Sequence, residues 1–361
     1  MQPEEQKEII KALIKVSRYT IYISIFALAG IAVAVLYMVN YDKTTVGVEQ
    51  KGVIAEVSSN IVSSQITPGG AIKEAAIADE WKAPDEATIP PGKTGDMIRY
   101  GKDLLANTAK YLGPNGSVAQ ITNGMNCQNC HLEGGTKLFA NNYGGFIASY
   151  PKLSNRSGRV APPSERISEC FERSLNGKAP DTSGKEVKAI LAYTRWLGSG
   201  VKKGQKLFGN ATEKLPYLDH AADPVQGKVV YLAKCRICHG DNGGGKLAVD
   251  KKTYTYPPLW GDHSYNDGAG MHRIANFAGF VKNNMPFGVT YKNPQLTNEE
   301  AWNVAAFVNS QPRPHRDQHN DWKNLKVKPI DFPFGPYADA FSEKQHKYGP
   351  FKPIQDSYKT K

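Results

Sequence analysis

The hydrophobic pattern of the chain opens with one long apolar segment. Residues 19–39, YTIYISIFALAGIAVAVLYMV, are 21 residues without a charge, and as a helix they span about 30 Å, one bilayer crossing. Basic residues precede the segment: Lys7, Lys11, Lys15 and Arg18. The positive-inside rule then predicts a cytoplasmic N-terminus at 1–18, an inner-membrane anchor at 19–39, and the remaining chain on the periplasmic side. The alternative is a cleaved signal peptide, but apolar residues continue beyond its candidate cleavage site at 32–34.

Beyond this segment, the apolar positions fall into two blocks of similar arrangement. Residues 40–90 are mixed in polarity and marked by Pro, which predicts a stalk. Each block has an opening helix, a long loop and a closing helix, which predicts one domain at 91–200 and another at 222–315, joined by a Gly/Lys-rich connector at 201–221. The tail, 316–361, is rich in Pro, Lys and aromatic residues, and we expect an irregular extension or a disordered one.

Helix-start signals precede the closing helix of each block. Ser183 and Glu186 have capping-box spacing in the first block, and Thr297 and Glu300 have it in the second. Pro312 follows the second helix, where helices commonly end. The pattern therefore predicts a predominantly helical fold.

Length and charge limit the classes of function. A chain of 361 residues is long enough for about two domains, and 40% hydrophobic residues is ordinary for a globular protein. The net charge of +11 favours anionic substrates, acidic protein partners or a membrane surface. The sequence has no long Lys/Arg run and no nucleic-acid-binding motif, so we expect no nucleic acid partner.

Each block carries a C-x-x-C-H motif. The two sets are Cys127, Cys130 and His131, and Cys235, Cys238 and His239. Two thiols at this spacing can reach the two vinyl groups of one haem, and the adjacent His can bind the iron. Zinc ligation, a redox pair and disulfides are the alternatives, but the motif occurs twice in a chain expected outside the membrane and without a βαβ pattern. We therefore expect two covalently bound haem c groups.

The second block offers methionines as a further iron ligand. Met285 lies in NNMPFG, 46 residues after His239 and next to a Pro, and a Met on such a loop is a common distal ligand of cytochromes c. Met271 competes for the role, and either methionine can instead be an ordinary core residue. We favour Met285.

The first block has no Met between His131 and its closing helix, but it has Cys170, 39 residues after His131. Ile167, Phe171 and Leu175 have the helical spacing of a core stripe around Cys170, so the thiol can be structural. Against this, the other four cysteines are committed to haem, and Cys170 is left without a disulfide partner in an oxidising compartment. Binding to iron as a thiolate explains the thiol better, and it would give that haem a low potential.

Several segments together resemble the dihaem thiosulfate dehydrogenases of periplasmic sulfur metabolism. They are NCQNCHLEGG, YPKLSNRSG, ERISECFERSLNG, PPLWGDHSYNDGAGMHRIANFAGFVKNNMPFG and AWNVAAFVNSQPRP, and the resemblance covers about 90–315. It implies an all-α pair of tandem cytochrome c domains behind the transmembrane helix. It also implies His131 and Cys170 as axial ligands of the first haem, and His239 and Met285 as those of the second. Some members have Lys before this methionine, whereas this chain has Asn284.

The resemblance implies an enzyme that joins two thiosulfates into tetrathionate, or runs the same couple in reverse, and passes two electrons through the haem groups to a cytochrome or respiratory complex. Joining two dianions requires cationic help. Arg156, Arg166 and Arg173 lie near Cys170 in sequence, although pairing with Glu165, Glu169 and Glu172 is the alternative use of these arginines. We take Cys170, Arg156 and Arg173 as candidate catalytic residues, with Cys170 able to bind a sulfane sulfur.

Two other function classes remain open. The first is a membrane-tethered electron-transfer subunit of a respiratory complex, in which Cys170 only sets a potential. The second is a dihaem peroxidase, which is disfavoured because a thiolate on the first iron leaves no open position there.

Overall fold

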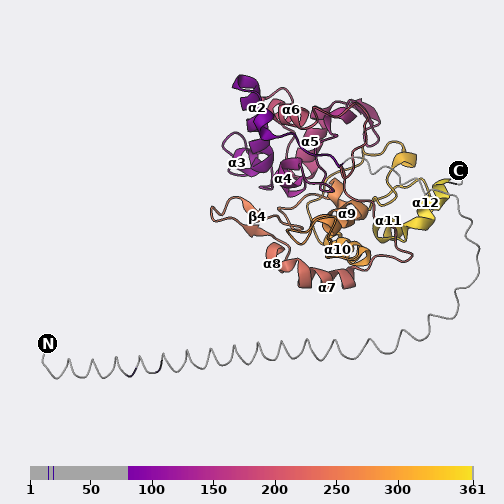
Figure 1. The fold of residues 1–361 in the computed structure, drawn as a ribbon. Coiled ribbons are helices and arrows are strands. Elements are labelled where there is room, and N and C mark those ends of the chain that lie inside the picture. Colours follow the sequence, from indigo (N-terminus) through magenta and orange to yellow (C-terminus); the bar gives the residue numbers. More distant parts are fainter. Residues whose placement is uncertain (1–14, 16–18, 20–79, 360–361) are drawn as a thin grey trace, which may run out of the picture. The chain divides into compact units, whose positions relative to one another are not determined.

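The computed structural model describes Lys15, Tyr19 and residues 80–359, and residues 80–359 belong to one compact unit (Figure 1). No helix in this described part of the chain is long and apolar enough to cross a membrane. The predicted anchor, 19–39, lies outside the described residues except for Tyr19, as do most residues of the predicted stalk.

The first hydrophobic core lies between the helices of the first block. These are α2 (Gly92–Ala106), α3 (Thr108–Leu112), α4 (Leu132–Gly135), α5 (Pro163–Arg173) and α6 (Lys185–Leu197). Helices α2 and α6 pack together, and a Cβ atom at Gly101 would collide with the carbonyl oxygen of Ala189. A glycine at the crossing therefore allows the two backbones to approach closely. Leu104, Phe171 and Tyr193 are buried in this core.

The second core repeats the crossing in the second block. Its helices are α7 (Pro224–Lys234), α8 (Arg236–His239), α9 (Ile274–Asn284) and α10 (Asn298–Ser310). Helix α7 packs on α10, and Gly227 meets the carbonyl oxygen of Asn303 as Gly101 meets that of Ala189. Tyr231 and Trp302 fill the core, and Trp302 Nε1 donates a hydrogen bond to the Pro216 carbonyl oxygen at 3.0 Å.

Two small antiparallel sheets accompany the helices. Strands β1 (Lys152–Ser154) and β2 (Arg159–Ala161) form one hairpin, and β3 (Lys246–Leu247) pairs with β4 (Tyr254–Tyr256) in the other. These hairpins are short, and the described part of the chain is rich in helices, in agreement with the predicted all-α fold class. The first hairpin leads directly into α5, with β2 next to the helix in the chain and β1 paired to β2.

Only one of the two expected capping boxes forms. Thr297 and Glu300 exchange both hydrogen bonds at the start of α10, as predicted. The box predicted at Ser183 is wrong, because α6 begins at Lys185 after Gly184. The carboxylate of Asp181 instead accepts hydrogen bonds from both the backbone N–H and the hydroxyl of Ser183, which ties up the side chain that would have capped the helix.

The tail is more regular than expected. Helices α11 (Glu343–Tyr348) and α12 (Phe351–Lys359) end it, coloured yellow in Figure 1, and Phe351 and Ile354 are buried in the second core. The description of 316–361 as irregular is therefore wrong for these helices, because two apolar side chains three positions apart anchor α12 to the core. Before α11 the tail has a short 3-10 helix, Leu325–Val327, and is otherwise irregular.

Candidate functional site

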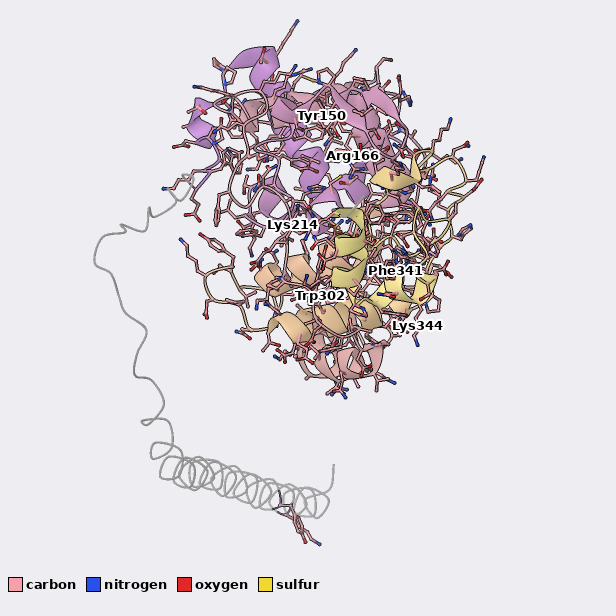
Figure 2. The ribbon with its side chains drawn as sticks, turned by 90° about the vertical axis from the view of Figure 1, so that its right-hand side faces the viewer. Tyr150, Arg166, Lys214, Trp302, Phe341 and Lys344 are labelled. Atoms are coloured by element: carbon pink, nitrogen blue, oxygen red, sulfur yellow. The ribbon has the colours of Figure 1, made fainter. Side chains whose placement is uncertain are left out.

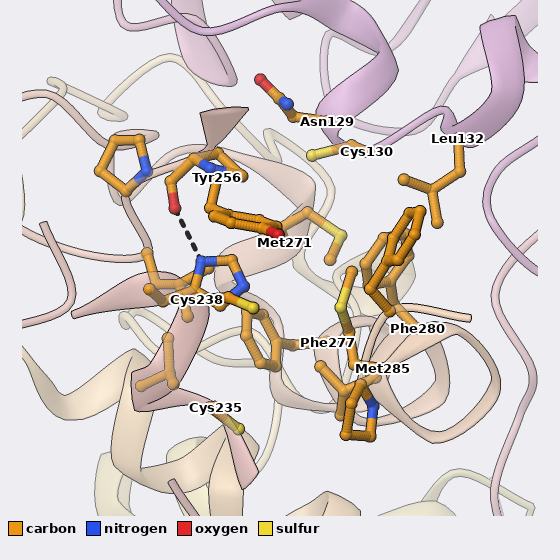
Figure 3. A pocket seen from close by; sticks show the side chains of 18 of the residues that line it. Asn129, Cys130, Leu132, Cys235, Cys238, Tyr256, Met271, Phe277, Phe280 and Met285 are labelled. Carbon is orange, nitrogen blue, oxygen red and sulfur yellow. Dashed lines mark hydrogen bonds between the residues drawn. The ribbon is translucent and has the colours of Figure 1, made fainter. Parts of the chain in front are cut away.

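The second C-x-x-C-H motif lines a cavity of about 420 Å³ (Figure 3). The motif residues Cys235, Cys238 and His239 form one part of its wall, and the rest is mainly apolar. The other lining residues include Tyr256, Leu259, Tyr265, Phe277, Phe280 and Val281. This volume and lining are typical of a site that buries a large, flat organic group.

Both motif histidines are held in one orientation by a backbone carbonyl. His239 Nδ1 lies 2.8 Å from the Pro257 oxygen (dashed in Figure 3), and His131 Nδ1 lies 2.5 Å from the Asn141 oxygen. Because a carbonyl only accepts, Nδ1 carries the proton and Nε2 keeps a free lone pair. Burial lowers the pKa of both rings, that of His131 to about 4. Each ring is therefore neutral and suited to bind a metal through Nε2.

Two methionines of the second block enter the cavity at the second motif, called the second cavity below. Met285 directly follows α9, and Met271 lies in a short 3-10 helix, Gly270–His272. Both line the cavity together with His239, and Figure 3 shows both thioether side chains entering it. The structure thus places the favoured candidate, Met285, and its competitor, Met271, at the same site.

The first motif lines a smaller cavity of about 200 Å³, called the first cavity below. Cys127 and His131 of the motif form its wall together with Cys170, although Cys170 lies 39 positions further along the chain. None of the five cysteines is in a disulfide. The first cavity therefore gathers one motif thiol, the motif imidazole and the remaining thiol.

The predicted core stripe and Cys170 lie next to one another at the first cavity. Ile167, Phe171 and Leu175 are buried in the first core, so the predicted stripe exists. Ile167 and Phe171 also line the first cavity, together with Cys170. The stripe is thus part of the core, as the structural interpretation expects, and Cys170 lies where this core meets the cavity.

The cations at the first cavity differ from those expected. Arg166 lines the cavity, and Figure 2 shows it near Tyr150, a second lining residue. The nearby Cys170 side chain is the largest cause of a raised pKa at Arg166, ahead of Glu169, so the guanidinium stays charged. Arg156 and Arg173 are not among the lining residues. Arg156 pairs with Glu169 and Asp321, and Arg173 pairs with Asp321.

Sequence reasoning missed Lys152. This residue of β1 lines the first cavity and is exposed to solvent; partial burial lowers its pKa, with a further contribution from the charge of Arg166. It lies in YPKLSNRSG, one of the segments that carry the family resemblance, but nothing in the sequence shows that the hairpin lies against α5. The cavity therefore presents two cationic side chains beside a thiol.

The first motif also separates the two cavities. Cys127 lines the first cavity, whereas Cys130 lines the second, together with Leu132. Figure 3 shows Cys130 and Leu132 entering from the first block, at the opposite side from Cys235. The two sites are thus neighbours that share one motif as a wall.

Comparison with known proteins agrees with this arrangement. The sequence pattern of the Cytochrome c family matches residues 224–312. The chain is 38% identical over 234 residues to a thiosulfate dehydrogenase of Stutzerimonas stutzeri, covering 65% of this chain and 73% of the relative. It is 40% identical over 235 residues to that of Allochromatium vinosum, covering 64% and 83%. The chain belongs to the thiosulfate dehydrogenase family.

A solved structure of this family has the same fold. The thiosulfate dehydrogenase of Marichromatium purpuratum in its as-isolated form superimposes with a TM-score of 0.60 at 32% identity. The match covers 66% of this chain and 50% of the other, so this chain spans half the length of that protein. The chain is a helix-rich c-type cytochrome and an oxidoreductase of the thiosulfate dehydrogenase type.

The residues of the C-x-x-C-H motifs fit haem c. Burial raises the pKa of the Cys127 and Cys130 thiols to about 12 and that of Cys235 to about 11, so all three are neutral thiols before attachment. A neutral imidazole with a free Nε2 stands next to each thiol pair. Haem c is therefore the cofactor that this member of the thiosulfate dehydrogenase family is built to hold.

Proposed function

We propose that the protein oxidises two thiosulfates to tetrathionate with two haem c groups, one in each of two tandem cytochrome c domains at 91–200 and 222–315. One observation carries this proposal: Cys170 and the cations Arg166 and Lys152 share a cavity with the first attachment motif. An electron carrier could use Cys170 to set a haem potential, but that role requires no pair of cations beside the thiol. The related thiosulfate dehydrogenases support the same reaction.

The proposed ligands follow from the two cavity walls. His131 and Cys170 would hold the first haem iron, and His239 and Met285 the second. The free Nε2 of each imidazole and the placement of Cys170 in the first cavity support this assignment. Met285 is preferred to Met271 because it lies outside regular structure, beyond the end of α9, as distal methionines of cytochromes c commonly do.

The side chains of the first cavity suggest how the substrate is handled. Arg166 and Lys152 would hold the thiosulfate dianion by charge-assisted hydrogen bonds. Cys170 Sγ and the sulfane sulfur then form a disulfide bond, which gives Cys–S–S–SO₃⁻ and releases two electrons. A second thiosulfate attacks the sulfane sulfur of this adduct, which forms tetrathionate and returns the Cys170 thiolate. Haem c would supply the acceptors, one electron to each of two groups. The same contacts serve the reverse reaction.

We expect an Arg166→Gln protein to bind thiosulfate about tenfold more weakly, seen as a raised KM. A charge-assisted hydrogen bond contributes about 1.5–3 kcal/mol, and the glutamine cannot supply its charge. Steady-state kinetics with an artificial electron acceptor measure the change. Arg159→Gln is the matched control, because Arg159 is 65% exposed and pairs with Glu165 outside the cavity. Equal KM values for wild type and Arg166→Gln would show that Arg166 does not bind thiosulfate.

We also propose that residues 19–39 anchor the protein in the inner membrane, with the haem domains on the periplasmic side and with a respiratory cytochrome or complex as electron acceptor. The uncharged run and the basic residues before it support this location.

The intact mass of the purified protein tests the haem count and the anchor together. We expect the mass of the whole chain from Met1 or Gln2 plus two haem groups, because each thioether bond survives denaturation. A chain that begins near residues 35–45 would show a cleaved leader, and a mass with fewer than two haem groups would contradict the dihaem assignment.

A further inference from the structure

A network of buried charges connects the tail to helix α5, outside both cavities. Asp321 Oδ1 accepts a hydrogen bond from Arg173 Nη2 at 2.8 Å, and Asp321 Oδ2 lies 3.6 Å from Arg156 Nε. The side chains of Asp321, Arg156 and Arg173 are only 11%, 13% and 8% exposed. Ion pairs screened so little by water are stronger than surface pairs, and removal of one partner leaves a buried charge uncompensated.

From Asp321 the charges alternate in sign up to the first cavity. Arg156 Nη1 lies 3.4 Å from Glu169 Oε2. The same Glu169 oxygen accepts a hydrogen bond from Arg166 Nη1 at 2.8 Å. Arg166 lines the cavity beside Cys170. Four charged groups, Asp321, Arg156, Glu169 and Arg166, therefore form a continuous series from the tail to the proposed substrate site.

The backbone next to Asp321 fixes Arg156 further. The Trp322 N–H donates to the Arg156 carbonyl oxygen at 2.8 Å. The Arg156 guanidinium lies over the Trp322 ring, with its Cζ atom 5.5 Å from the ring centre. Burial lowers the pKa of Arg156 to about 10, and the nearby charges of Arg173 and Arg166 contribute. Arg156 is thus crowded by two like charges, and two carboxylates, Glu169 and Asp321, offset them.

We propose that Asp321 is a positioning residue for substrate binding, which acts through Arg156 and Glu169 to hold Arg166 toward the first cavity. With Asp321 in place, Arg156 is shared between two carboxylates, and Glu169 remains available to Arg166. Without the charge of Asp321, Arg156 draws Glu169 toward itself, and Arg166 loses the partner that fixes its direction. The inference rests on the proposed binding of thiosulfate at Arg166.

Replacement of Asp321 by Asn tests this role. We expect KM for thiosulfate to rise about tenfold, as for loss of a charge-assisted contact, while kcat at saturating thiosulfate changes less than about threefold, because no group in contact with substrate is altered. Asp317→Asn is the matched control: Asp317 lies in the same segment, but it is 71% exposed and pairs only with His319 among the described ion pairs. We expect wild-type values for it. An unchanged KM in Asp321→Asn would overturn the proposal.

A double-mutant cycle separates positioning from a general structural effect. In an Arg166→Gln background, Asp321→Asn should raise KM no further, because the Arg166 guanidinium that Asp321 positions is already absent. Additive effects would show that Asp321 does not act through Arg166. If Asp321→Asn yields no folded protein, Asp321→Glu decides instead. It keeps the charge but displaces the carboxylate, so we expect a smaller rise, about threefold, that also disappears in the Arg166→Gln background.

Binding of sulfate distinguishes failure of this inference from failure of the proposed function. Sulfate is a dianion like thiosulfate but has no sulfane sulfur, so titration calorimetry measures its binding to the holoprotein without turnover. We expect Asp321→Asn to weaken sulfate binding about tenfold and Asp317→Asn to leave it unchanged. If wild type binds sulfate but oxidises no thiosulfate, the proposed reaction is wrong. The positioning role of Asp321 is then still tested by comparing sulfate binding in Asp321→Asn and wild type. If Asp321→Asn binds sulfate as wild type does, the positioning role is wrong.

Discussion

A Cys170→Ala protein is expected to keep two covalently bound haem groups and to lose thiosulfate oxidation by a factor of about 100 or more, as is typical when a participating catalytic group is removed. The four attachment thiols are untouched by the substitution, and the buried stripe beside Cys170 keeps α5 in the core. Alanine offers no sulfur to bind a sulfane sulfur. Turnover with an artificial acceptor measures the loss and bypasses the physiological partner.

The control for this experiment is Ser168→Ala on the same helix. The Ser168 hydroxyl donates to the Ser164 carbonyl oxygen within α5, and Ser168 does not line the first cavity. We expect its turnover to equal that of wild type. If Cys170→Ala oxidises thiosulfate as fast as wild type, the proposed covalent step is wrong. If wild type itself shows no turnover in either direction, the electron-carrier interpretation replaces the enzyme.

A Gly227→Leu protein is expected to be less stable by about 3 kcal/mol, the upper end of the usual cost of overpacking a core. Glycine inside a helix is less favourable than alanine by about 1 kcal/mol, so its presence in α7 reflects the close crossing with α10. Any side chain at this position meets the carbonyl oxygen of Asn303. The thermal midpoint should fall by about 6 °C or more, measured by circular dichroism.

Gly200→Ala is the matched control for this substitution. Gly200 has no heavy atom within 4 Å of the position that a Cβ would occupy, so the added methyl group meets nothing. We expect its thermal midpoint to match that of wild type. A Gly227→Leu protein with the wild-type midpoint would show that the α7–α10 crossing does not depend on the absence of a side chain.

Local signals in the sequence predicted the parts of the site that depend on short spacing. A C-x-x-C-H motif fixes which residues can share one haem, and the capping box at Thr297 reports a helix start within four residues. Cys170 was found because the other four cysteines lie in the two C-x-x-C-H motifs, which leaves no cysteine to form a disulfide with it. The tail helices carried a usable signal too, since Ser342 caps α11 through the Gln345 N–H.

Contacts between distant segments were beyond the reach of such signals. Arg156, Arg166 and Arg173 all lie within 14 residues of Cys170 in the chain, and the sequence does not say which of them meets a carboxylate from elsewhere in the chain. Asp321 lies 148 residues after Arg173, and it pairs with Arg173 and Arg156, whereas Arg166 lines the cavity. Lys152 reaches the cavity through the β1–β2 hairpin, which the helical pattern did not predict.

The contact between Asp321 and Arg173 joins parts of the chain that are made at different times. A chain emerges from the ribosome N-terminus first, so both C-x-x-C-H motifs and Cys170 are made well before Asp321 follows. Helix α5 therefore waits for its partner in the tail. The proposed substrate site reaches its final geometry only when the last part of the chain has been made, and a chain cut short after the second motif would contain both motifs but lack Asp321.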